Sequence, residues 1–588
     1  MYISEIRLWN FRKYGDDDFD LTKPHLIVPF KKGMNVLIGE NDAGKTAIID
    51  AIKYVLKTNA YEAIRLQQDD FYKDKEHLRI EVHIADMTDN EARHFTNLAT
   101  PPADGNGLAT MKLVIDATRK DGHVLPYEVR GGNDADGHPL DALMRENLRV
   151  TYLKPLRDAE NELTAKKNSR LSQILQSHEL LKQPKNGEHE LISIIKEANA
   201  KIEAWFEEDK NGASSNKAQI KDVIDSFLKR FISEDAESQF LLADPTIKNI
   251  LERLAISVVD SKNLGLGTLN RLFMATELLH LGKKGDNLKV CLIEELEAHI
   301  HPQAQMKVIS ALQNVDNVQF LLTTHSPNIT SKVKLGSDEN VHNVIICKDN
   351  NVFPMGRDYT MLKKKDYKYL DTFLDVTKSN LFFAKGVILV EGWAEDILIP
   401  AIAQKIGIDL TQKEISVVNV GSTAYLHFAR IFMRNNAPEM DVKCAIVTDL
   451  DVKPDNPEKA KKEKEKKDSI NSQLGDLPNN VQLYLAKEWT LEWCLFNSPI
   501  LSDLFKDSVA AVHSRTIEFK KTGEPLQYKP EFKDKLMKML AKTDGSKLDK
   551  TAVALELSEK IKASQNLDFT IQDDYIKYLL DAIRFVTQ

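Results

Sequence analysis

Two groups of residues in this sequence have the types and spacing that phosphate and metal chemistry requires. Residues 39–46, GENDAGKT, match the pattern GxxxxGK[ST] between a short apolar run and an amphipathic segment. The backbone amides of such a loop and the N-terminus of the helix after it bind phosphate oxygens. We therefore predict a nucleotide site whose loop includes Asn41 and Gly44. Lys45 should reach the β- and γ-phosphates, and Thr46 should bind Mg²⁺.

Further candidates for this site follow two later apolar runs. Residues 290–293 end in Glu294 and Glu295; we expect Glu294 to bind Mg²⁺ through water and Glu295 to polarise the attacking water. Residues 318–323 lead to His325, which is placed to sense the γ-phosphate. Gly265 and Gly267 open a helix before the first of these runs, and an ordinary glycine-containing helix start is the alternative there.

The second group is acidic. Glu391 follows the apolar run 386–390, and Asp449 and Asp451 follow the run 444–448. Because the carboxyl ends of parallel strands meet at one edge of a sheet, we expect these three carboxylates to converge. Glu395 lies one helical turn beyond Glu391. Such a cluster suits Mg²⁺ or Mn²⁺, which would bind a scissile phosphate and activate water. A surface turn is the alternative for the DxD motif alone.

The elements that must position these residues alternate between strands and helices, which predicts an α/β protein with a parallel sheet in its C-terminal part. Long charged stretches with helical spacing indicate a helical insertion that serves dimerisation. Residues 363–368 are basic and indicate a loop-like joint. The run 453–468, rich in Lys and Glu, predicts a solvated loop or exposed helix, with a DNA-contact patch as the alternative. The predicted segments are 1–157 and 252–380 for the two halves of the first domain, 158–251 for the insertion and 381–588 for the last domain.

Composition limits the choice of protein class. The chain has 588 residues and a net charge of −8, so any attraction to nucleic acid must come from local basic patches or bound metal. There is no apolar run of the roughly 18 residues that suggest a membrane span, and the first residues lack a secretory signal. The 4 cysteines show no CxxC spacing, which argues against zinc and disulfides. We expect a cytoplasmic protein without membrane contact.

The order of the nucleotide motifs resembles the ABC-type ATPase heads of the SMC, RecF and OLD (overcoming lysogenization defect) proteins. The string 294–302, EELEAHIHP, is similar to the OLD and RecF type, and Arg12 matches their habit of placing an arginine near the nucleotide. Residues 263–268 resemble a degenerate ABC signature, so Gly265 and Gly267 would contact the nucleotide of a partner subunit and a dimer is implied. Glu294 stands in place of the usual aspartate, which predicts slow hydrolysis. Gln67 or Gln68 is the candidate for a glutamine loop.

The acidic group resembles the Toprim domain of topoisomerases, primases and OLD nucleases. In that family the first glutamate and the DxD motif carry the metals, which implies these roles for Glu391, Asp449 and Asp451. Residues 489–494 resemble the OLD segment with a further acidic ligand, which implies Glu492, with Glu488 as the alternative. Residues 549–555 resemble the stretch whose lysine faces the scissile phosphate. Lys550 would then stabilise transition-state charge, and one exposed lysine among many is the alternative.

An ABC head interrupted by a helical arm and followed by a Rossmann-like Toprim domain is the OLD-family arrangement. The resemblance implies an ATP-regulated DNA endonuclease that uses Mg²⁺ or Mn²⁺, acts as a homodimer or larger homo-oligomer, and serves bacterial anti-phage defence. A UvrD-like helicase or retron RNA/DNA are the further partners it suggests. One alternative is an SMC-like ATP-switch scaffold without nuclease activity, although the chain lacks a long coiled coil. Another is a topoisomerase or primase, for which no strand-transfer tyrosine domain is visible.

Overall fold

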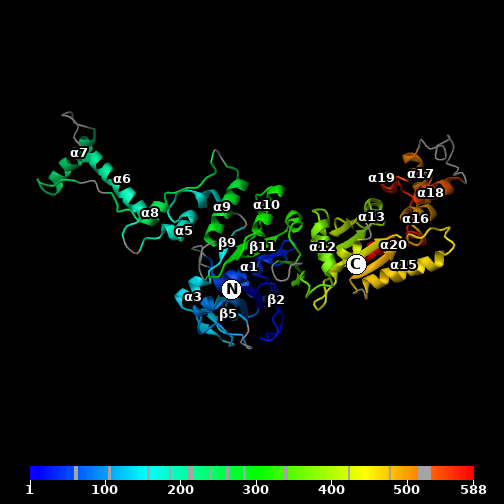
Figure 1. The fold of residues 1–588 in the computed structure, drawn as a ribbon, viewed down its shortest axis with the longest axis horizontal. Helices are drawn as coiled ribbons and strands as arrows, with labels where there is room; N and C mark the ends of the chain where they lie inside the picture. Colours follow the sequence, from blue (N-terminus) through cyan, green and yellow to red (C-terminus); the bar gives the residue numbers. More distant parts are fainter. Residues whose placement is uncertain are drawn as a thin grey trace.

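The computed structural model describes residues 1–588 except 59–63, 103–106, 135, 155–158, 185–186, 208–215, 239–241, 260–263, 282–286, 336–341, 422–423, 476–477, 514–530 and 544. The chain is elongated, with a helical arm at one end, two sheets in the middle and a third sheet at the other end (Figure 1). This mixture of helices and sheets confirms the predicted α/β class. No helix within the described ranges is long and apolar enough to cross a membrane.

The first sheet is antiparallel and comes from the N-terminal part of the chain. Its strand order is β2-β1-β4-β5-β7-β8, with β6 beside β5. Ile3, Ile6 and Leu8 of β1 are buried. The spacing from Ile3 to Ile6 is one residue longer than strict alternation allows, and a register shift against β4 between Ile3 and Glu5 accommodates the extra residue. The strands are β1 (Tyr2–Trp9), β2 (Leu26–Pro29), β4 (His77–Met87), β5 (Ala109–Lys120), β6 (His123–Val124), β7 (Val129–Gly131) and β8 (His138–Pro139).

The second sheet positions the nucleotide motifs. Its order is β13-β12-β3-β11-β10-β9; five of these strands are parallel, and β13 forms an antiparallel hairpin with β12. Strands β3, β10 and β11 are buried along their whole length, which explains their continuous apolar runs. The strands are β3 (Met34–Ile38), β9 (Thr151–Leu153), β10 (Val290–Ile293), β11 (Gln319–Thr324), β12 (Asn343–Lys348) and β13 (Asn351–Pro354).

Helices cover both faces of this second sheet. Leu37 of β3 belongs to one core cluster together with Ile48 of α1, whereas Val36 belongs to another with Phe273 of α9 and Ile309 of α10. Successive side chains of a strand point to opposite faces, so α1 lies on one side of the sheet and α9 and α10 on the other. The helices of this part are α1 (Lys45–Leu56), η1 (Gln68–Asp70), α2 (Asp89–Arg93), α3 (Ala142–Asn147), α9 (Leu266–Leu281), α10 (Pro302–Leu312) and α11 (Pro327–Thr330).

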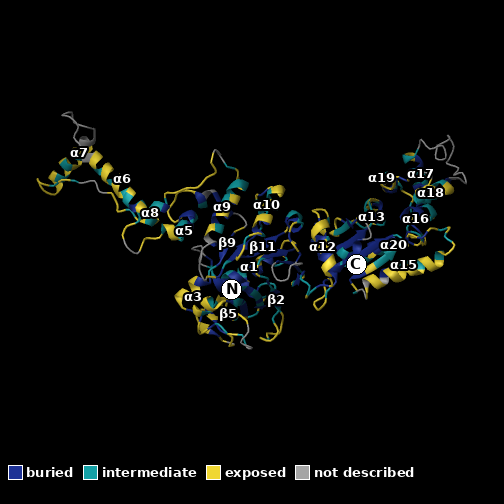
Figure 2. Ribbon diagram, in the orientation of Figure 1, coloured by how far each residue is buried: buried dark blue, intermediate teal, exposed yellow. Residues whose placement is uncertain are grey.

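The segment after β9 is helical, as the sequence predicts, and its outer part projects away from the sheets (Figure 1). Large apolar side chains there are exposed, among them Trp205 at 52%, Val223 at 57% and Phe231 at 77% (Figure 2). The predicted boundary at 157–158 lies outside the described residues, and the domain limits stay predictions. The helices are α4 (Ala159–Leu163), α5 (Arg170–Gln176), η2 (Glu179–Leu181), α6 (Glu190–Glu207), α7 (Asn216–Phe231) and α8 (Ile247–Leu251).

The predicted joint at 363–368 is wrong as a loop, because most of it is helical. Helix α12 (Lys364–Phe373) begins there, with the Asp366 side chain accepting a hydrogen bond from the Lys363 backbone N–H at 2.7 Å. Tyr367 and Leu370 are buried on its inner face. Only two residues of this mostly basic segment are apolar and buried. They are sufficient for a short helix because its first turn is capped and other parts of the chain cover its inner face.

The third sheet is parallel throughout, as predicted, and has the order β15-β14-β16-β17. Residues of β14 alternate between two core clusters, so helices cover both faces. The strands are β14 (Gly386–Val390), β15 (Ile415–Asn419), β16 (Lys443–Thr448) and β17 (Val481–Leu485). The helices are η3 (Lys378–Phe382), α13 (Trp393–Lys405), α14 (Tyr425–Ala429), η4 (Arg430–Phe432), α15 (Lys459–Leu474), α16 (Leu491–Asn497), α17 (Ser502–Val512), α18 (Glu531–Ala541), α19 (Lys550–Ala563) and α20 (Lys577–Thr587).

Candidate functional site

The glycine-rich loop connects β3 to α1 at the carboxyl edge of the second sheet. Gly44 has φ 95°, a left-handed conformation that favours glycine, and an added Cβ would lie 2.0 Å from the Tyr14 hydroxyl oxygen. Lys45 Nζ donates hydrogen bonds to the carbonyl oxygens of Gly39 at 2.7 Å and Glu40 at 2.6 Å, which holds the loop curled. Asn41 is exposed in the same loop. The backbone cradle therefore fits a phosphate chain at the N-terminus of α1.

Thr46 and Glu294 meet at this edge. The Glu294 carboxylate is 3% exposed, and it accepts hydrogen bonds from the Tyr152 hydroxyl at 2.7 Å and from the Thr46 side chain. Burial raises the pKa of Glu294, since the charged form loses water there. A Mg²⁺ ion between these two oxygen-bearing side chains would replace the missing solvation, so the pair fits the predicted magnesium role.

His325 and Glu295 follow the neighbouring strands β11 and β10. Glu297, which was not among the predicted site residues, connects the ends of these two strands. Glu297 accepts hydrogen bonds from the Thr324 hydroxyl at 2.9 Å and the His325 backbone N–H at 2.8 Å, and its Oε1 lies 3.1 Å from His325 Nδ1. The Glu295 backbone N–H donates to Thr323 Oγ1 at 3.1 Å. The spacing EELE was visible in the sequence, but which of the three carboxylates turns back towards the next strand depends on the loop after β10.

Three other predicted nucleotide-site residues lie apart from the phosphate loop itself. The Arg12 guanidinium forms ion pairs with Asp50 at 2.8 Å and Asp70 at 2.9 Å, and the two carboxylates raise its pKa against the opposing effect of burial. Gly265 precedes α9 and would leave an added Cβ in open space. An added Cβ at Gly267 would lie 2.7 Å from the His299 carbonyl oxygen. Their contacts with nucleotide stay predictions.

The acidic residues gather at the carboxyl edge of the third sheet. Val390 of β14 is in register with Val447 of β16, so Glu391 and Thr448 leave the sheet side by side, and the Thr448 hydroxyl donates to Glu391 Oε1. One residue further, Asp449 Oδ1 accepts a hydrogen bond from the Leu491 backbone N–H at 2.8 Å. That bond ties Asp449 to the N-terminus of α16, which also carries Glu492 in its first turn.

Three of these carboxylates have a raised pKa, and burial is the largest cause of the rise in each. Burial, and then Glu492, raise the pKa of Glu395 to about 7. Burial raises the pKa of Asp449 well above its usual range, with Glu492 and Glu395 adding to the effect. The pKa of Glu391 is raised by burial in the same way. Because the charged forms of these carboxylates are disfavoured by burial, a bound cation would stabilise them.

Of the two alternatives named for the later ligand, the structure brings Glu492 to the cluster. Glu492 is 2% exposed, and its Oε2 lies 2.8 Å from Lys550 Nζ. Glu488 instead pairs with Lys459 at 3.0 Å and accepts from the Trp493 indole N–H at 3.1 Å. Lys550, the first residue of α19, thus lies at the acidic cluster.

Asp451 lies at the outer rim of this edge. Its backbone has φ 58°, and its carboxylate Oδ2 lies 2.9 Å from Lys466 Nζ of α15. Lys466 was not among the predicted site residues. Its sequence context is a run of lysines and glutamates, and only the packing of α15 shows which of them turns inward.

The donor set of the acidic edge fits a divalent cation in chemistry. The carboxylates that gather there offer oxygen, the class of ligand that Mg²⁺ and Mn²⁺ take. The buried Glu492 Oε1 has no hydrogen-bond partner. Within the described residues, however, no three His, Cys, Asp or Glu side chains are already arranged around one metal position. The hydroxyl of Thr448 and the ammonium groups of Lys550 and Lys466 occupy carboxylate oxygens instead.

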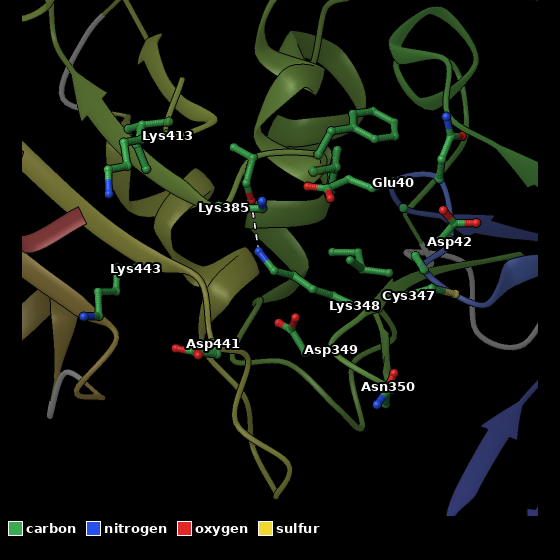
Figure 3. Close-up of a pocket in the computed structure, with 18 of the residues that line it drawn as sticks. Glu40, Asp42, Cys347, Lys348, Asp349, Asn350, Lys385, Lys413, Asp441 and Lys443 are labelled. Carbon is green, nitrogen blue, oxygen red and sulfur yellow. Dashed lines mark hydrogen bonds between the residues drawn. The ribbon is translucent and has the colours of Figure 1, made fainter. Parts of the chain in front are cut away.

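A cavity of about 750 Å³ lies between the phosphate loop and the third sheet (Figure 3). Glu40 and Asp42 of the loop line one side, and Lys385, Lys413 and Lys443 line the other. Lys348, the last residue of β12, bridges the two parts by donating to the Ala384 carbonyl oxygen at 3.2 Å. The loop that would hold phosphate is therefore in direct reach of the domain that carries the acidic edge.

Comparison with known proteins agrees with this geometry. The family described as "AAA ATPase domain" matches residues 1–254 and 149–330, and the family "Overcoming lysogenization defect protein-like, TOPRIM domain" matches residues 382–451. The chain is 24% identical to endonuclease GajA of Bacillus cereus (strain HuB5-5), over 78% of each chain. It is 23% identical to the OLD nuclease of Thermus scotoductus, over 77% of this chain and 82% of that protein.

A third relative is named as a retron ATPase. The retron Vc95 probable ATPase of Vibrio cholerae is 22% identical over 56% of this chain and 72% of its own length. The ATPase match covers the sheet edge with Lys45 and Glu294, and the Toprim match covers Glu391, Asp449 and Asp451. The chain therefore belongs to the AAA ATPase domain family, whose match covers more than half of it, and carries an OLD-like Toprim domain after the ATPase part.

Proposed function

We propose that this protein is an ATP-regulated, divalent-metal-dependent DNA endonuclease that works as a homodimer in bacterial anti-phage defence. The observation that carries the proposal is the gathering of Glu391, Glu395, Asp449 and Glu492 at one sheet edge beside Lys550. Two relatives named as nucleases cover more than three quarters of the chain, and the Toprim family match at 382–451 includes Glu391, Glu395 and Asp449.

In the proposed reaction, water attacks a phosphodiester phosphorus, and the bond to one ester oxygen breaks. Glu391, Asp449, Asp451 and Glu492 would hold a Mg²⁺ or Mn²⁺ ion, which would supply Lewis acidity and an activated water. Thr448 fixes the Glu391 carboxylate by its hydrogen bond, and the Leu491 amide fixes that of Asp449. Lys550 moves from Glu492 towards the phosphate and neutralises the negative charge that develops on its oxygens.

The nucleotide edge supplies the regulation in this proposal. Lys45 and the loop amides bind the phosphates, and Thr46 with Glu294 hold the magnesium that accompanies the nucleotide. Glu295 orients the attacking water, and His325, held by Glu297, contacts the γ-phosphate. Gly265 and Gly267 would face the nucleotide of the second copy, whose position the exposed apolar helices of the arm help to set.

The direct test is plasmid cleavage by the full chain. Supercoiled DNA incubated with the wild-type protein and Mg²⁺ or Mn²⁺ should be nicked or linearised, and the rate should change when ATP is added. Asp449→Ala should lower cleavage by a factor of roughly 10³ or more, as expected when a metal ligand of a nuclease is lost. ATP binding, measured with a fluorescent analogue, should stay unchanged.

The control variant is Asp534→Ala, which removes an exposed carboxylate from α18 in the same domain. It should cut DNA at the wild-type rate. If wild-type protein leaves the plasmid intact with either metal, with and without ATP, the nuclease proposal is wrong. ATP-driven dimerisation without cleavage would instead support the ATP-switch scaffold.

A further inference from the structure

Helix α15 differs in charge from the rest of the chain. Its sequence, KAKKEKEKKDSINSQL, holds six lysines and three acidic residues, whereas the whole protein carries a net charge of −8. The lysines at 461, 462, 464 and 467 are exposed, and this outer face is visible in Figure 2. A helix of this composition needs no partner to be soluble, so its charge alone assigns no role.

The inner face of α15 shows which of its residues contact the rest of the domain. Lys459, Glu463, Lys466 and Ile470, spaced as one helical face, are the less exposed residues of its first three turns. Only Ile470 is both apolar and buried. Ile470 packs in a hydrophobic core, and the N-terminal half of this face makes two ion pairs: Lys466 with Asp451 of the acidic edge at 2.9 Å, and Lys459 with Glu488, outside the carboxylate cluster, at 3.0 Å. The N-terminal half of α15 is thus held on the rim of the proposed nuclease site by exchangeable charges.

Two lysine ammonium groups lie beside the carboxylates, one from α19 and the other from α15. Lys550 of α19 pairs with Glu492, and its charge also acts on Asp449 and Glu395. Lys466 of α15 pairs with Asp451, and its charge also acts on Glu391. Each lysine therefore neutralises one side of the cluster. A cation bound by Asp451 and Glu391 would repel Lys466 and release it, because like charges at this distance disfavour each other.

We infer that α15 is the DNA-contacting helix of the nuclease site and that Lys466 exchanges its Asp451 partner for a DNA phosphate. Without metal, Lys466 occupies Asp451; when a divalent cation binds that carboxylate, Lys466 turns to a DNA phosphate beside the scissile bond, and Lys461 and Lys464 of the outer face contact phosphates farther along the strand. The inference rests on the proposed nuclease function. A chain with a net charge of −8 could in this way attract DNA to an edge lined with carboxylates, because the lysines of α15 supply a local positive charge.

Two binding measurements on the full chain test this without requiring cleavage. The first titrates Mn²⁺ by calorimetry in the absence of DNA. Lys466→Gln removes the competing ammonium, so Mn²⁺ should bind roughly two- to fivefold more tightly. The second measures binding of a short DNA duplex by fluorescence anisotropy in Ca²⁺ at several salt concentrations. There Lys466→Gln should weaken binding and reduce the slope of log affinity against log salt by about one.

Two further variants separate the parts of the inference. The double variant Lys461→Gln with Lys464→Gln should lower DNA affinity and reduce the salt slope by about two, and leave Mn²⁺ affinity unchanged. Lys538→Gln changes an exposed lysine of α18 in the same domain and should match wild type in both measurements. If Lys466→Gln leaves either Mn²⁺ affinity or the DNA salt slope at the wild-type value, the inference is overturned. A wild-type protein that shows both effects and fails to cut plasmid would refute the nuclease proposal alone.

Discussion

At the residue scale, Glu297 joins two strand ends of the nucleotide site. It accepts from Thr324 and from the His325 backbone, and it faces His325 Nδ1. The charge of Glu297 also acts on Lys45, ahead of Glu295 in size. Glu297 is therefore a positioning residue for His325 and a part of the electrostatic surroundings of the phosphate loop.

Glu297→Gln should lower ATP turnover roughly tenfold, since the exchange removes charged hydrogen bonds of about 1.5–3 kcal/mol each that orient His325. ATP affinity should change little, because Lys45 and the loop amides remain. Steady-state ATPase assays and a binding titration separate the two effects. The exposed Glu76→Gln serves as the matched control, and an ATP turnover equal to that of the control would remove Glu297 from the proposed mechanism.

The pKa of Glu395 gives a second prediction at this scale. Its carboxyl has a pKa of about 7 in the folded protein against an ordinary 4.5, because of burial and then Glu492. The folded state thus binds this proton more tightly than the unfolded state. The stabilisation is complete below pH 4.5 and is lost as the pH rises through 7.

Glu395→Gln cannot ionise, so the metal-free variant should melt at a higher temperature than wild type at pH 8 and at the same temperature at pH 4. Each kcal/mol gained corresponds to roughly 2–4 °C for a domain of 150–250 residues. Thermal melts in EDTA at the two pH values measure this. Glu559→Gln, exposed on α19, is the control; equal melting of Glu395→Gln and wild type at pH 8 would contradict a protonated Glu395.

The residue scale also shows where sequence reasoning ends. Glu391 and Asp449 were predictable, because each follows an apolar run and parallel strands deliver their carboxyl ends to one edge. Lys466 was not, since its neighbours in sequence are chemically the same and only the docking of α15 turns it inward. The choice between Glu488 and Glu492 likewise required the start of α16, which points Glu492 into the cluster.

At the element scale, the strands were the predictable part. The runs 290–293 and 386–390 coincide with β10 and β14, since buried parallel strands leave a continuous apolar signature. Helix α12 was missed because its apolar residues are few and its partner surface comes from elsewhere in the chain. Strand β9 was also not foreseen; its three residues are a strand only because they pair with β10.

The arm helices carry a prediction of their own. Helix α7 exposes Val223 at 57%, Phe227 at 48% and Phe231 at 77%, and the rings of Phe227 and Phe231 stack at 5.9 Å. Exposed apolar side chains in such a row are typical of a protein interface. Phe227→Glu should therefore convert the proposed dimer to a monomer in analytical ultracentrifugation.

The charged face of the same helix supplies the control. Lys229→Glu introduces the same residue two positions away and should leave the oligomeric state unchanged. Because both side chains are on an exposed helix, neither exchange should lower the melting temperature. A Phe227→Glu protein that still sediments with the wild-type mass would place the dimer contact outside α7.

At the scale of the whole molecule, the phosphate loop faces the amino ends of the third-sheet strands, the edge opposite to the one with the carboxylates. The cavity of about 750 Å³ has loop residues on one side and Toprim lysines on the other, and Lys348 bridges the parts (Figure 3). A nucleotide that reshapes the loop would change the shape and charge of this cavity. We expect regulation by ATP to act through this contact, because β14 and β16 run from this cavity to the carboxylates at their other ends.

The central claim is that the carboxylates at the edge of the third sheet hold a divalent cation. Anomalous diffraction from crystals of the full chain grown with Mn²⁺ tests it most directly. The account predicts a manganese peak in contact with Glu391 and Asp449, with Lys466 turned away from Asp451. A map with no manganese at this edge, from crystals that contain the ion in solution at saturating concentration, would contradict it.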